Sequence, residues 1–221
     1  MDILAHRGWW REKSEKNSRT AFERCFQAGY GCELDVRDCA GTLVISHDPP
    51  LTSDILTFPE LLKIHADSKT TGPIAINVKA DGLQDMIQQA LTQAGTVPHF
   101  LFDMSVPDTL VYLRKGMRVF VRQSEYEDFN SFGHDVAGVW LDFFHDRWAG
   151  KEVVHDHLNA GRSVALVSPE LHGRDHRADW QVWREVHREI EREDKNKKFP
   201  DSPRLMLCTD FPDEAEGFFN E

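Results

Sequence analysis

The sequence has no long apolar run and no apolar leader. It begins MDILAHRG, with an acid at position 2 and a histidine at position 6, whereas a secretory signal joins a basic leader to an apolar core. No later stretch approaches the roughly twenty apolar residues that a membrane-spanning helix needs. These absences predict a soluble, cytoplasmic protein without a transmembrane segment.

Basic residues are in the minority. The 221 residues include 26 Lys and Arg against 37 Asp and Glu, which gives a formal net charge of −11. Nucleic acids and anionic membranes are bound through basic surfaces that release counterions, so neither is expected as the main partner. A ligand that carries phosphate must therefore meet a local cluster of cations. The sequence leaves the oligomeric state open.

Cysteine is sparse, and no pair has the C-x-x-C spacing of a zinc or redox site. Cysteines stand at positions 25, 32, 39 and 208, which is too few for a disulfide scaffold. We interpret them as reduced, mostly buried, small apolar residues. The sequence also lacks the glycine-rich phosphate loops of dinucleotide-binding and P-loop proteins.

What the sequence does contain is a regular alternation of short β-branched or aromatic runs with longer segments of helical period. It predicts strands at 3–7, 32–37, 42–48, 73–80, 99–105, 118–123, 136–144, 163–170 and 205–211. Helices are predicted at 18–29, 58–67, 83–95, 106–116, 149–161 and 180–196. Helices that follow strands and end in glycine before the next strand indicate right-handed βαβ units in a parallel sheet.

About eight strands separated by helices predict that residues 1–221 form a single (β/α)8 TIM-type barrel domain of the α/β class. Functional side chains of such a barrel lie at the carboxyl ends of its strands. A doubly wound sheet is the alternative, but it would gather polar residues at one switch point. Here almost every predicted strand end carries them: His6, Arg7, Glu33, Asp35, His47, Asp48, Asn77, Lys79, Asp103, Arg122, Asp142, Ser168, Glu170 and Asp210.

The first fifty residues carry the densest chemistry. Glu33 and Asp35 stand at alternate positions of one predicted strand, so their carboxylates point to the same side. This geometry suits a metal or another cation, and the alternative is a structural salt bridge with Arg7 or Lys79. His6 and His47 bracket the pair and could supply the general base and general acid that a displacement at phosphorus requires.

Five segments together resemble the glycerophosphodiester phosphodiesterase family: AHRG, NSRTAF, G-x-x-x-ELDV, G-x-L-V-x-x-HDPPL and a late CTDFPDEA. The resemblance runs from end to end and implies a TIM-type barrel. It implies that His6 and His47 are the general acid and base. It further implies a divalent cation, Mg²⁺ or Ca²⁺, on Glu33 and Asp35, and phosphate contacts from Arg7 and Lys79.

Two acids common in that family are replaced. Lys16 stands where its members usually have glutamate before Asn17, and Asn77 stands where they have another glutamate. An asparagine oxygen can still bind a hard cation, but ligand charge sets much of the affinity. We therefore expect a metal site of Glu33, Asp35 and Asn77 that is weak or absent. Lys16 could neutralise phosphate instead, although a solvated loop position is the favoured interpretation.

The family's capping insertion after HDPPL is also missing, since Leu51 runs within a few residues into TFPELL. A cap closes over the glycerol end of the substrate, so its loss predicts an open mouth and a bulkier alcohol group. Aromatic residues could line this mouth, although ordinary packing is the favoured interpretation for them: Trp9, Trp10, Phe143, Phe144 and Trp148. Only one of the adjacent Trp9 and Trp10 can point inward, and we take Trp9 as the substrate contact.

The sequence thus predicts a phosphodiesterase that acts on a small-molecule phosphodiester, either glycerophosphodiester-like or linked to a sugar or lipid. Two alternatives stay open: a sphingomyelinase D-like lyase that releases a cyclic phosphate, and a non-catalytic phosphoester-binding protein. Four strand-end residues are weaker candidates for ligand contact: Asp103, Arg122, Asp142 and Glu170. Five later histidines lack a metal-ligand spacing and are expected at the surface: His155, His157, His172, His176 and His187.

Overall fold

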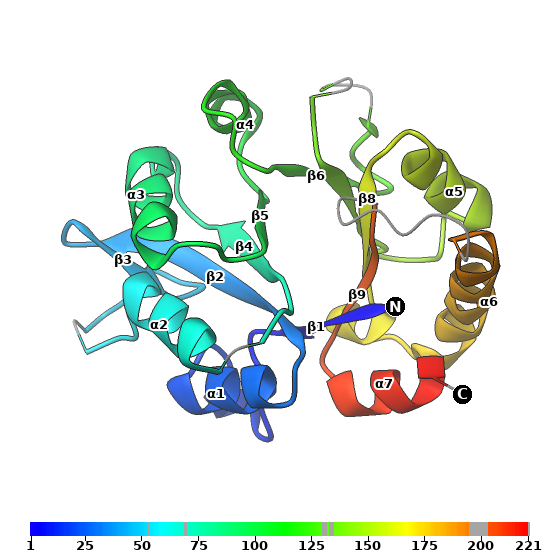
Figure 1. The fold of residues 1–221 in the computed structure, drawn as a ribbon, viewed down its shortest axis with the longest axis horizontal. Coiled ribbons are helices and arrows are strands. Elements are labelled where there is room, and N and C mark those ends of the chain that lie inside the picture. Colours follow the sequence, from blue (N-terminus) through cyan, green and yellow to red (C-terminus); the bar gives the residue numbers. More distant parts are fainter. Residues whose placement is uncertain (53, 69, 130–131, 133–134, 195–202, 221) are drawn as a thin grey trace.

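The computed structural model describes residues 1–52, 54–68, 70–129, 132, 135–194 and 203–220 (Figure 1). Its strands are β1 (Asp2–His6), β2 (Gly31–Cys39), β3 (Thr42–Ile45), β4 (Ile74–Val78), β5 (His99–Phe102), β6 (Phe120–Gln123), β7 (Gly138–Leu141), β8 (Ser163–Val167) and β9 (Leu205–Thr209). Its α-helices are α1 (Arg19–Gln27), α2 (Phe58–Ser68), α3 (Gln84–Ala94), α4 (Val106–Arg114), α5 (Lys151–Asn159), α6 (Arg177–Asp194) and α7 (Pro212–Asn220). Among the described residues are also the 3-10 helices η1 (Lys13–Glu15) and η3 (Pro169–His172).

Eight parallel strands form one curved sheet in the order β5-β4-β2-β1-β9-β8-β7-β6. The two ends of this order meet at a single parallel bridge between Leu101 and Val119, where the Leu101 amide donates to the Arg118 carbonyl at 2.9 Å. Strand β3 pairs with β2 as an antiparallel hairpin, and Val44 of β3 also forms an isolated antiparallel bridge with Thr57. The predicted α/β TIM-type barrel is confirmed, with a seam between β5 and β6, and the doubly wound alternative is wrong.

The barrel interior is filled by alternate strand side chains, because neighbouring strand residues point to opposite faces. These side chains form a cluster of their own: Leu4, Ala75, Phe100, Phe102, Phe120, Trp140, Ala165, Val167, Met206 and Cys208. The Phe100 ring stacks on Phe120 at a centroid distance of 3.8 Å, across the seam. The interior is therefore a packed core, and polar groups are left to the strand ends.

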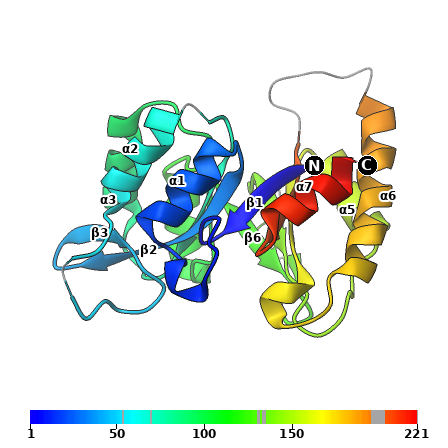
Figure 2. The ribbon, with the colours of Figure 1, turned by 90° about the horizontal axis from the view of Figure 1, so that it is seen from below.

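The outer faces of the strands pack against the surrounding helices (Figures 1 and 2). Helix α1 shows why: it begins at Ser18, whose hydroxyl accepts from the Ala21 amide, and it buries Phe22 and Phe26. Figure 2 shows β1 lying between α1 and α7. The predicted elements are confirmed within a few residues, except that α7 was not predicted. The predicted end of the sixth helix, 195–196, lies outside the described residues.

The cysteines of the structure are free, and Cys25, Cys32 and Cys208 are buried, as predicted. Burial raises the pKa of Cys32 and Cys208 well above the ordinary value, so both stay protonated thiols. In the part of the chain that the structure describes, no helix is both long and apolar enough to span a bilayer.

The prediction of surface positions for the later histidines is wrong for His157, His176 and His187, which are buried. They were expected at the surface because they lie in helical or polar stretches without a metal-ligand spacing. The rings of His157 and His187 are instead hydrogen-bonded to polar partners, which makes their burial possible, and His176 Nε2 lies 3.5 Å from Glu214 Oε1. His157 on α5 contacts Gln123 Oε1 through Nε2 at 2.8 Å, and its Nδ1 accepts from Arg162 Nε at 3.0 Å.

His157 should make the protein sensitive to acid. Burial, followed by the Arg162 guanidinium, lowers the pKa of His157 from 6.5 to about 4. Between these values the unfolded chain binds a proton that the folded chain does not, so stability falls as the pH decreases from 6.5 towards 4. Between pH 7 and pH 4.5, His157 should lower the unfolding free energy of the unmodified protein by about 2–3 kcal/mol. The His157→Gln variant should not show this decrease. Urea titrations at the two pH values measure it.

The control for this prediction is His155→Gln, because His155 lies on the same helix and pairs with Glu189 at 3.3 Å near the surface. This variant should follow the unmodified protein at both pH values. An equal loss of stability in the His157→Gln variant and the unmodified protein would contradict the prediction.

Candidate active site

Strand register brings the predicted site residues together at the carboxyl ends of β1, β2 and β4. His6 of β1 is aligned with Glu33 of β2, and Asp35 of β2 is aligned with Asn77 of β4. Lys79 follows β4 directly, and its amide donates to the Val36 carbonyl at 2.9 Å. Neighbouring residues on parallel strands that point into the barrel mouth form one polar surface.

A tight turn after β1 places Arg7. Its amide donates to the Glu33 carbonyl at 2.9 Å, and it has a left-handed backbone with φ 58°. Gly8 follows with φ 89°, and a Cβ at this position would lie 2.7 Å from Ala21 Cβ of α1. Glycine is required here because it permits this close approach and this backbone conformation. The turn directs the Arg7 side chain to Asp35, with Nε 2.9 Å from Oδ2.

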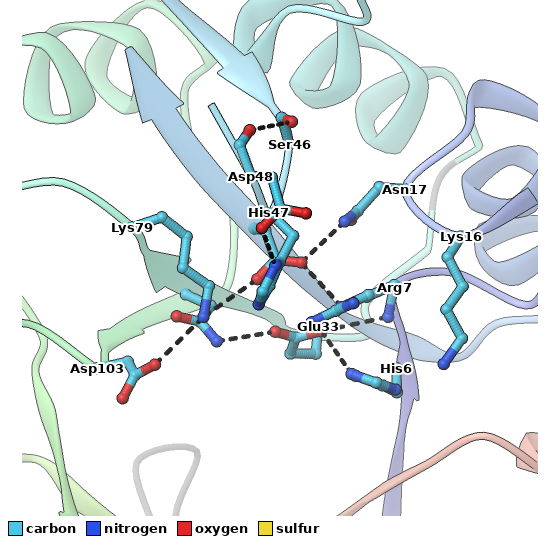
Figure 3. A network of polar contacts seen from close by, with 12 residues as sticks. His6, Arg7, Lys16, Asn17, Glu33, Ser46, His47, Asp48, Lys79 and Asp103 are labelled. Atoms are coloured by element: carbon cyan, nitrogen blue, oxygen red, sulfur yellow. Dashed lines mark hydrogen bonds and ion pairs between the residues drawn. The ribbon is translucent and has the colours of Figure 1, made fainter. Parts of the chain in front are cut away.

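The two carboxylates on β2 are buried, with 2% exposure for Glu33 and 0% for Asp35. Asp35 meets Arg7 as above, accepts from Asn17 Nδ2 at 2.8 Å, and lies 3.4 Å from Lys79 Nζ (Figure 3). The salt bridges weighed as an alternative from the sequence are therefore present. Burial, followed by the neighbouring Asp35 carboxylate, raises the pKa of Glu33 above its ordinary value.

His6 is oriented by an acid from the far end of the chain. Its Nδ1 lies 2.6 Å from Asp210 Oδ1, just after β9, and its Nε2 faces Glu33 Oε2 at 3.9 Å. Burial acts to raise the pKa of Asp210, but the hydrogen bond from His6 and the Lys16 ammonium outweigh it and hold the pKa below its ordinary value. An ionised Asp210 accepts from Nδ1–H, which leaves Nε2 directed into the mouth.

His47 approaches from the opposite side. It follows β3, its side chain is 46% exposed, and its Nδ1 lies 2.9 Å from Asp48 Oδ1. The Ser46 amide donates to the Asp35 carbonyl at 3.0 Å, which fixes this connection beside β2. In Figure 3, Glu33 lies between the His6 and His47 side chains. Each imidazole thus has a carboxylate on Nδ1, an arrangement suited to proton transfer through Nε2.

Beyond Glu33 and Asp35, basic and acidic side chains alternate across the carboxyl ends of the neighbouring strands. Lys79 Nζ lies 3.3 Å from Asp103 Oδ2, and Asp103 contacts Arg122 of β6. Asp103 has a left-handed backbone with φ 72°, which is uncommon for aspartate and marks an imposed conformation. The weaker strand-end candidates Asp103 and Arg122 therefore belong to the same polar network as Asp35 and Lys79.

The remaining strand-end candidates, Asp142 and Glu170, each make polar contacts of their own. Asp142 accepts from His172 at 2.6 Å, and this histidine is partly buried rather than at the surface. Glu170 Oε1 accepts from the Asp210 amide at 3.0 Å and also bonds the Thr209 hydroxyl. Glu170 thus supports the acid that orients His6.

Lys16 differs from its favoured sequence interpretation, whereas Trp9, which we took as the substrate contact, packs as the favoured interpretation of the aromatics expected. Lys16 is not a solvated loop residue, because its Nζ lies 3.2 Å from Asp210 Oδ2 and 4.6 Å from the centroid of the Trp10 ring. Trp10 Nε1 donates to the His6 carbonyl at 3.1 Å. Trp9 packs edge-on against Tyr30 at 5.5 Å, on the hydrophobic core. Trp10 is therefore the tryptophan beside His6.

Three oxygen-bearing residues could hold a hard cation. Asp35 Oδ1 and Asn77 Oδ1 are buried without a hydrogen-bond donor, and Asn77 Nδ2 donates to Glu33 at 3.3 Å. Across the described ranges, no cluster of three or more His, Cys, Asp or Glu side chains forms a metal site. Two carboxylates and one amide oxygen suit Mg²⁺ or Ca²⁺ chemically, but their low charge and the adjacent Arg7 and Lys79 weaken the fit.

Comparisons with known proteins show similarity in structure alone, since no family model and no curated protein matches the sequence. A phosphodiesterase of Oleispira antarctica, solved with its product sn-glycerol-3-phosphate, is 15% identical over 100% of this chain and 97% of its own, with a TM-score of 0.70. A glycerophosphodiester phosphodiesterase of Agrobacterium tumefaciens is 17% identical over 98% and 99%, with a TM-score of 0.66. A Ca²⁺-dependent phosphatidylinositol-specific phospholipase C of Streptomyces antibioticus is 10% identical over 99% and 95%, with a TM-score of 0.53. This chain shares the barrel fold of these phosphodiesterases over its whole length.

Proposed function

We propose that this protein is a glycerophosphodiester phosphodiesterase-like enzyme that cleaves a small-molecule phosphodiester. The observation that carries the proposal is the pair of imidazoles, His6 and His47, on opposite sides of the buried Glu33. The neighbouring carboxylate, Asp35, is paired with Arg7 and Lys79. A phosphodiester carries one negative charge, and these two cations are the groups in the mouth that would bind its oxygens.

The proposed reaction is a displacement at phosphorus. A hydroxyl next to the phosphate on the substrate, or a water, attacks phosphorus and forms a new P–O bond. One histidine removes the proton of the attacking oxygen, and the P–O bond to the second alcohol breaks. The other histidine protonates the departing alkoxide. Arg7 and Lys79 stabilise the charge that develops on the phosphoryl oxygens, in a site where buried side chains restrict water.

A divalent cation would be held by Glu33, Asp35 and Asn77, which lie on the neighbouring strands β2 and β4. When bound, it would neutralise part of the phosphate charge. Because Asn77 contributes no charge and Asp35 is already paired, Arg7 and Lys79 carry more of this task than they would in a site with three carboxylates.

Substituting Asn77 should reveal the cation site. We expect Mg²⁺ or Ca²⁺ to bind the unmodified protein with a dissociation constant weaker than about 1 μM, and Asn77→Glu to tighten binding at least about tenfold by adding a charged oxygen. Calorimetric titration with each metal measures both constants. Submicromolar binding to the unmodified protein would contradict the prediction, as would a variant that binds no better. Asn77→Asp is the matched control, because it adds the same negative charge on a side chain that is one methylene shorter than glutamate.

A turnover assay tests the proposed function directly. Bis(p-nitrophenyl) phosphate and a set of natural-type phosphodiesters are incubated with the protein, with and without chelator, and phosphorus NMR identifies the products. Turnover to a phosphomonoester supports the proposal. A cyclic phosphate that accumulates as the end product identifies the lyase alternative. Binding of phosphodiesters without any turnover identifies a phosphoester-binding protein and overturns the proposal.

A further inference from the structure

A cavity of about 290 Å³ lies at the amino ends of the strands, which is the end of the barrel opposite to the candidate active site. Several of its lining residues stand at or shortly before the beginning of a strand: Pro73, His99, Arg118, Ser163 and Arg204. Phe100, Phe120 and Met206 of the barrel interior also line it, so the packed core forms its floor. Its volume is slightly below the roughly 300–1,000 Å³ of pockets for drug-sized ligands, so this amino-end cavity suits a compact ligand.

The alternation of strand side chains brings three polar residues to this cavity. Arg118, Ser163 and Arg204 each stand two positions before a residue of the interior cluster: Phe120, Ala165 and Met206. Residues two apart in an extended chain point to the same side, so these three side chains are on the inner side of the barrel wall. They therefore meet in one cavity and do not lie on separate outer faces.

The charges of the lining restrict which ligand fits. Arg118 and Arg204 are cationic, His99 can become so, and no acid stands among the described lining residues. This excess of positive charge occurs in a chain whose formal net charge is −11. A guanidinium group donates hydrogen bonds and accepts none, so this lining suits a ligand that is negatively charged and accepts hydrogen bonds.

The two guanidinium groups remain available to such a ligand. Over the described residues, the one acid that pairs with either of them is Asp2, whose Oδ2 lies 3.3 Å from Arg204 Nη1. Both side chains of this pair are nearly half exposed, and ion pairs between exposed groups contribute little. Burial lowers the pKa of His99, the hydrogen bond to the Val97 carbonyl raises it, and the Arg118 guanidinium lowers it further. Arg118 and His99 are thus close enough to repel each other when both are charged.

His99 and Ser163 each keep a polar group for a ligand. The Val97 carbonyl accepts from His99 Nδ1 at 2.7 Å, which leaves Nε2 of this ring without a partner among the described residues. Ser163 is 1% exposed, and its Oγ accepts from the Arg204 amide at 3.0 Å. In the described part of the chain, the hydroxyl proton of Ser163 has no acceptor. A buried donor without an acceptor is costly, and an oxyanion in the cavity would satisfy it.

We propose that the amino-end cavity is a second ligand site and that it binds one compact oxyanion, a phosphate group that is free or carried by a small phosphomonoester. A phosphate group presents three or more acceptor oxygens, so it can accept from Arg118, Arg204 and the Ser163 hydroxyl together, whereas a carboxylate has two oxygens. The site does not depend on the proposed function, because its residues lie at the other end of the barrel from His6 and His47.

NMR of the histidine side chains separates this site from the candidate active site. Inorganic phosphate replaces chloride at constant pH and ionic strength, and the imidazole signals of the whole protein are followed. The His99 signal, assigned from a His99→Gln variant, reports the amino-end cavity, and the signals of His6 and His47 report the barrel mouth. We expect the His99 signal to follow a saturable curve with a dissociation constant of about 1 mM or below. A His99 signal that does not change with phosphate would overturn the proposal.

Two substitutions should change the affinity read at His99 in opposite directions. Arg118→Gln should weaken it at least about tenfold, because a charge-assisted hydrogen bond is lost. Arg118 is exposed and bonds Leu101 through its backbone carbonyl, so the substitution leaves the fold intact. Asp2→Asn should tighten binding about twofold or more, because it frees Arg204 from its acid. Neither variant should alter the phosphate response of His6 and His47. An unchanged curve in Arg118→Gln, or weaker binding in Asp2→Asn, would contradict the assignment.

Arg114→Gln is the matched control, because it removes the same charge at an exposed position of α4 that does not line the cavity. It should keep the dissociation constant of the unmodified protein, and an effect as large as that of Arg118→Gln would show a general charge effect and overturn the site. Ethyl phosphate distinguishes the two sources of the phosphate group. Tighter binding than that of inorganic phosphate identifies a phosphomonoester whose alcohol group contacts the apolar floor, and weaker binding identifies free phosphate; both results support the site.

Discussion

Replacing either His6 or His47 by alanine is expected to lower kcat for a phosphodiester at least about a hundredfold, the usual contribution of a positioned proton-transfer group. The reason is geometric: the two rings lie on opposite sides of Glu33, and each has a carboxylate on Nδ1. Steady-state kinetics with a chromogenic diester measure kcat and KM. Since the two groups act in one step, the double variant should lose far less than the product of the two single effects.

Two observations control this result. His155→Ala removes a histidine of α5 that pairs with Glu189, and it should keep normal kcat. Circular dichroism and a thermal melt should show that both active-site variants stay folded. Activity within about threefold of the unmodified protein in a folded His6→Ala or His47→Ala variant would remove that residue from the mechanism.

Asp210→Asn should give the second large effect, a fall in kcat of about tenfold to a hundredfold with KM changed less than about threefold. Asp210 accepts from His6 at 2.6 Å, and this bond fixes the tautomer in which Nε2 faces the mouth. An asparagine amide can donate to Nδ1 instead, which stabilises the other tautomer. The expected loss therefore lies in proton transfer and not in substrate binding.

The matched control for Asp210→Asn is Asp213→Asn, an exposed acid in the first turn of α7. It removes the same charge at nearly the same place in the chain and should leave kcat and KM unchanged. A large rise in KM for Asp210→Asn with normal kcat would show that Asp210 acts on binding and does not orient His6.

The barrel could be predicted from the sequence because its strands and helices are short, regular and separated by clear breaks. The predicted strands at 32–37 and 42–48, for example, correspond to β2 and β3 of the structure. Helix α7 was not predicted; its nine residues include Gly217, which has low helix propensity. The shared face of Glu33 and Asp35 followed from alternation along one strand, which is a local property.

The parts of the site that the sequence did not predict depend on contacts between distant elements. Asp210 was recognised as a strand-end acid, but its bond to His6 requires β9 to lie next to β1. Lys16 pairs with the same Asp210, although its charged neighbours in the sequence suggested a solvated side chain. The difference between Trp9 and Trp10 depends on a turn of the backbone after Gly8, which no periodic pattern describes.

The position of β1 in the sheet has a consequence for how the chain folds. One partner of β1 is β2, which lies within the first forty residues, and the other is β9, which lies past residue 200. Pairing over so long a stretch of chain is costly in entropy and slow to form. Since His6 ends β1 and Asp210 follows β9, the bond between these two side chains can form only in that late step. The proposed activity should therefore appear during refolding later than the helical signal does.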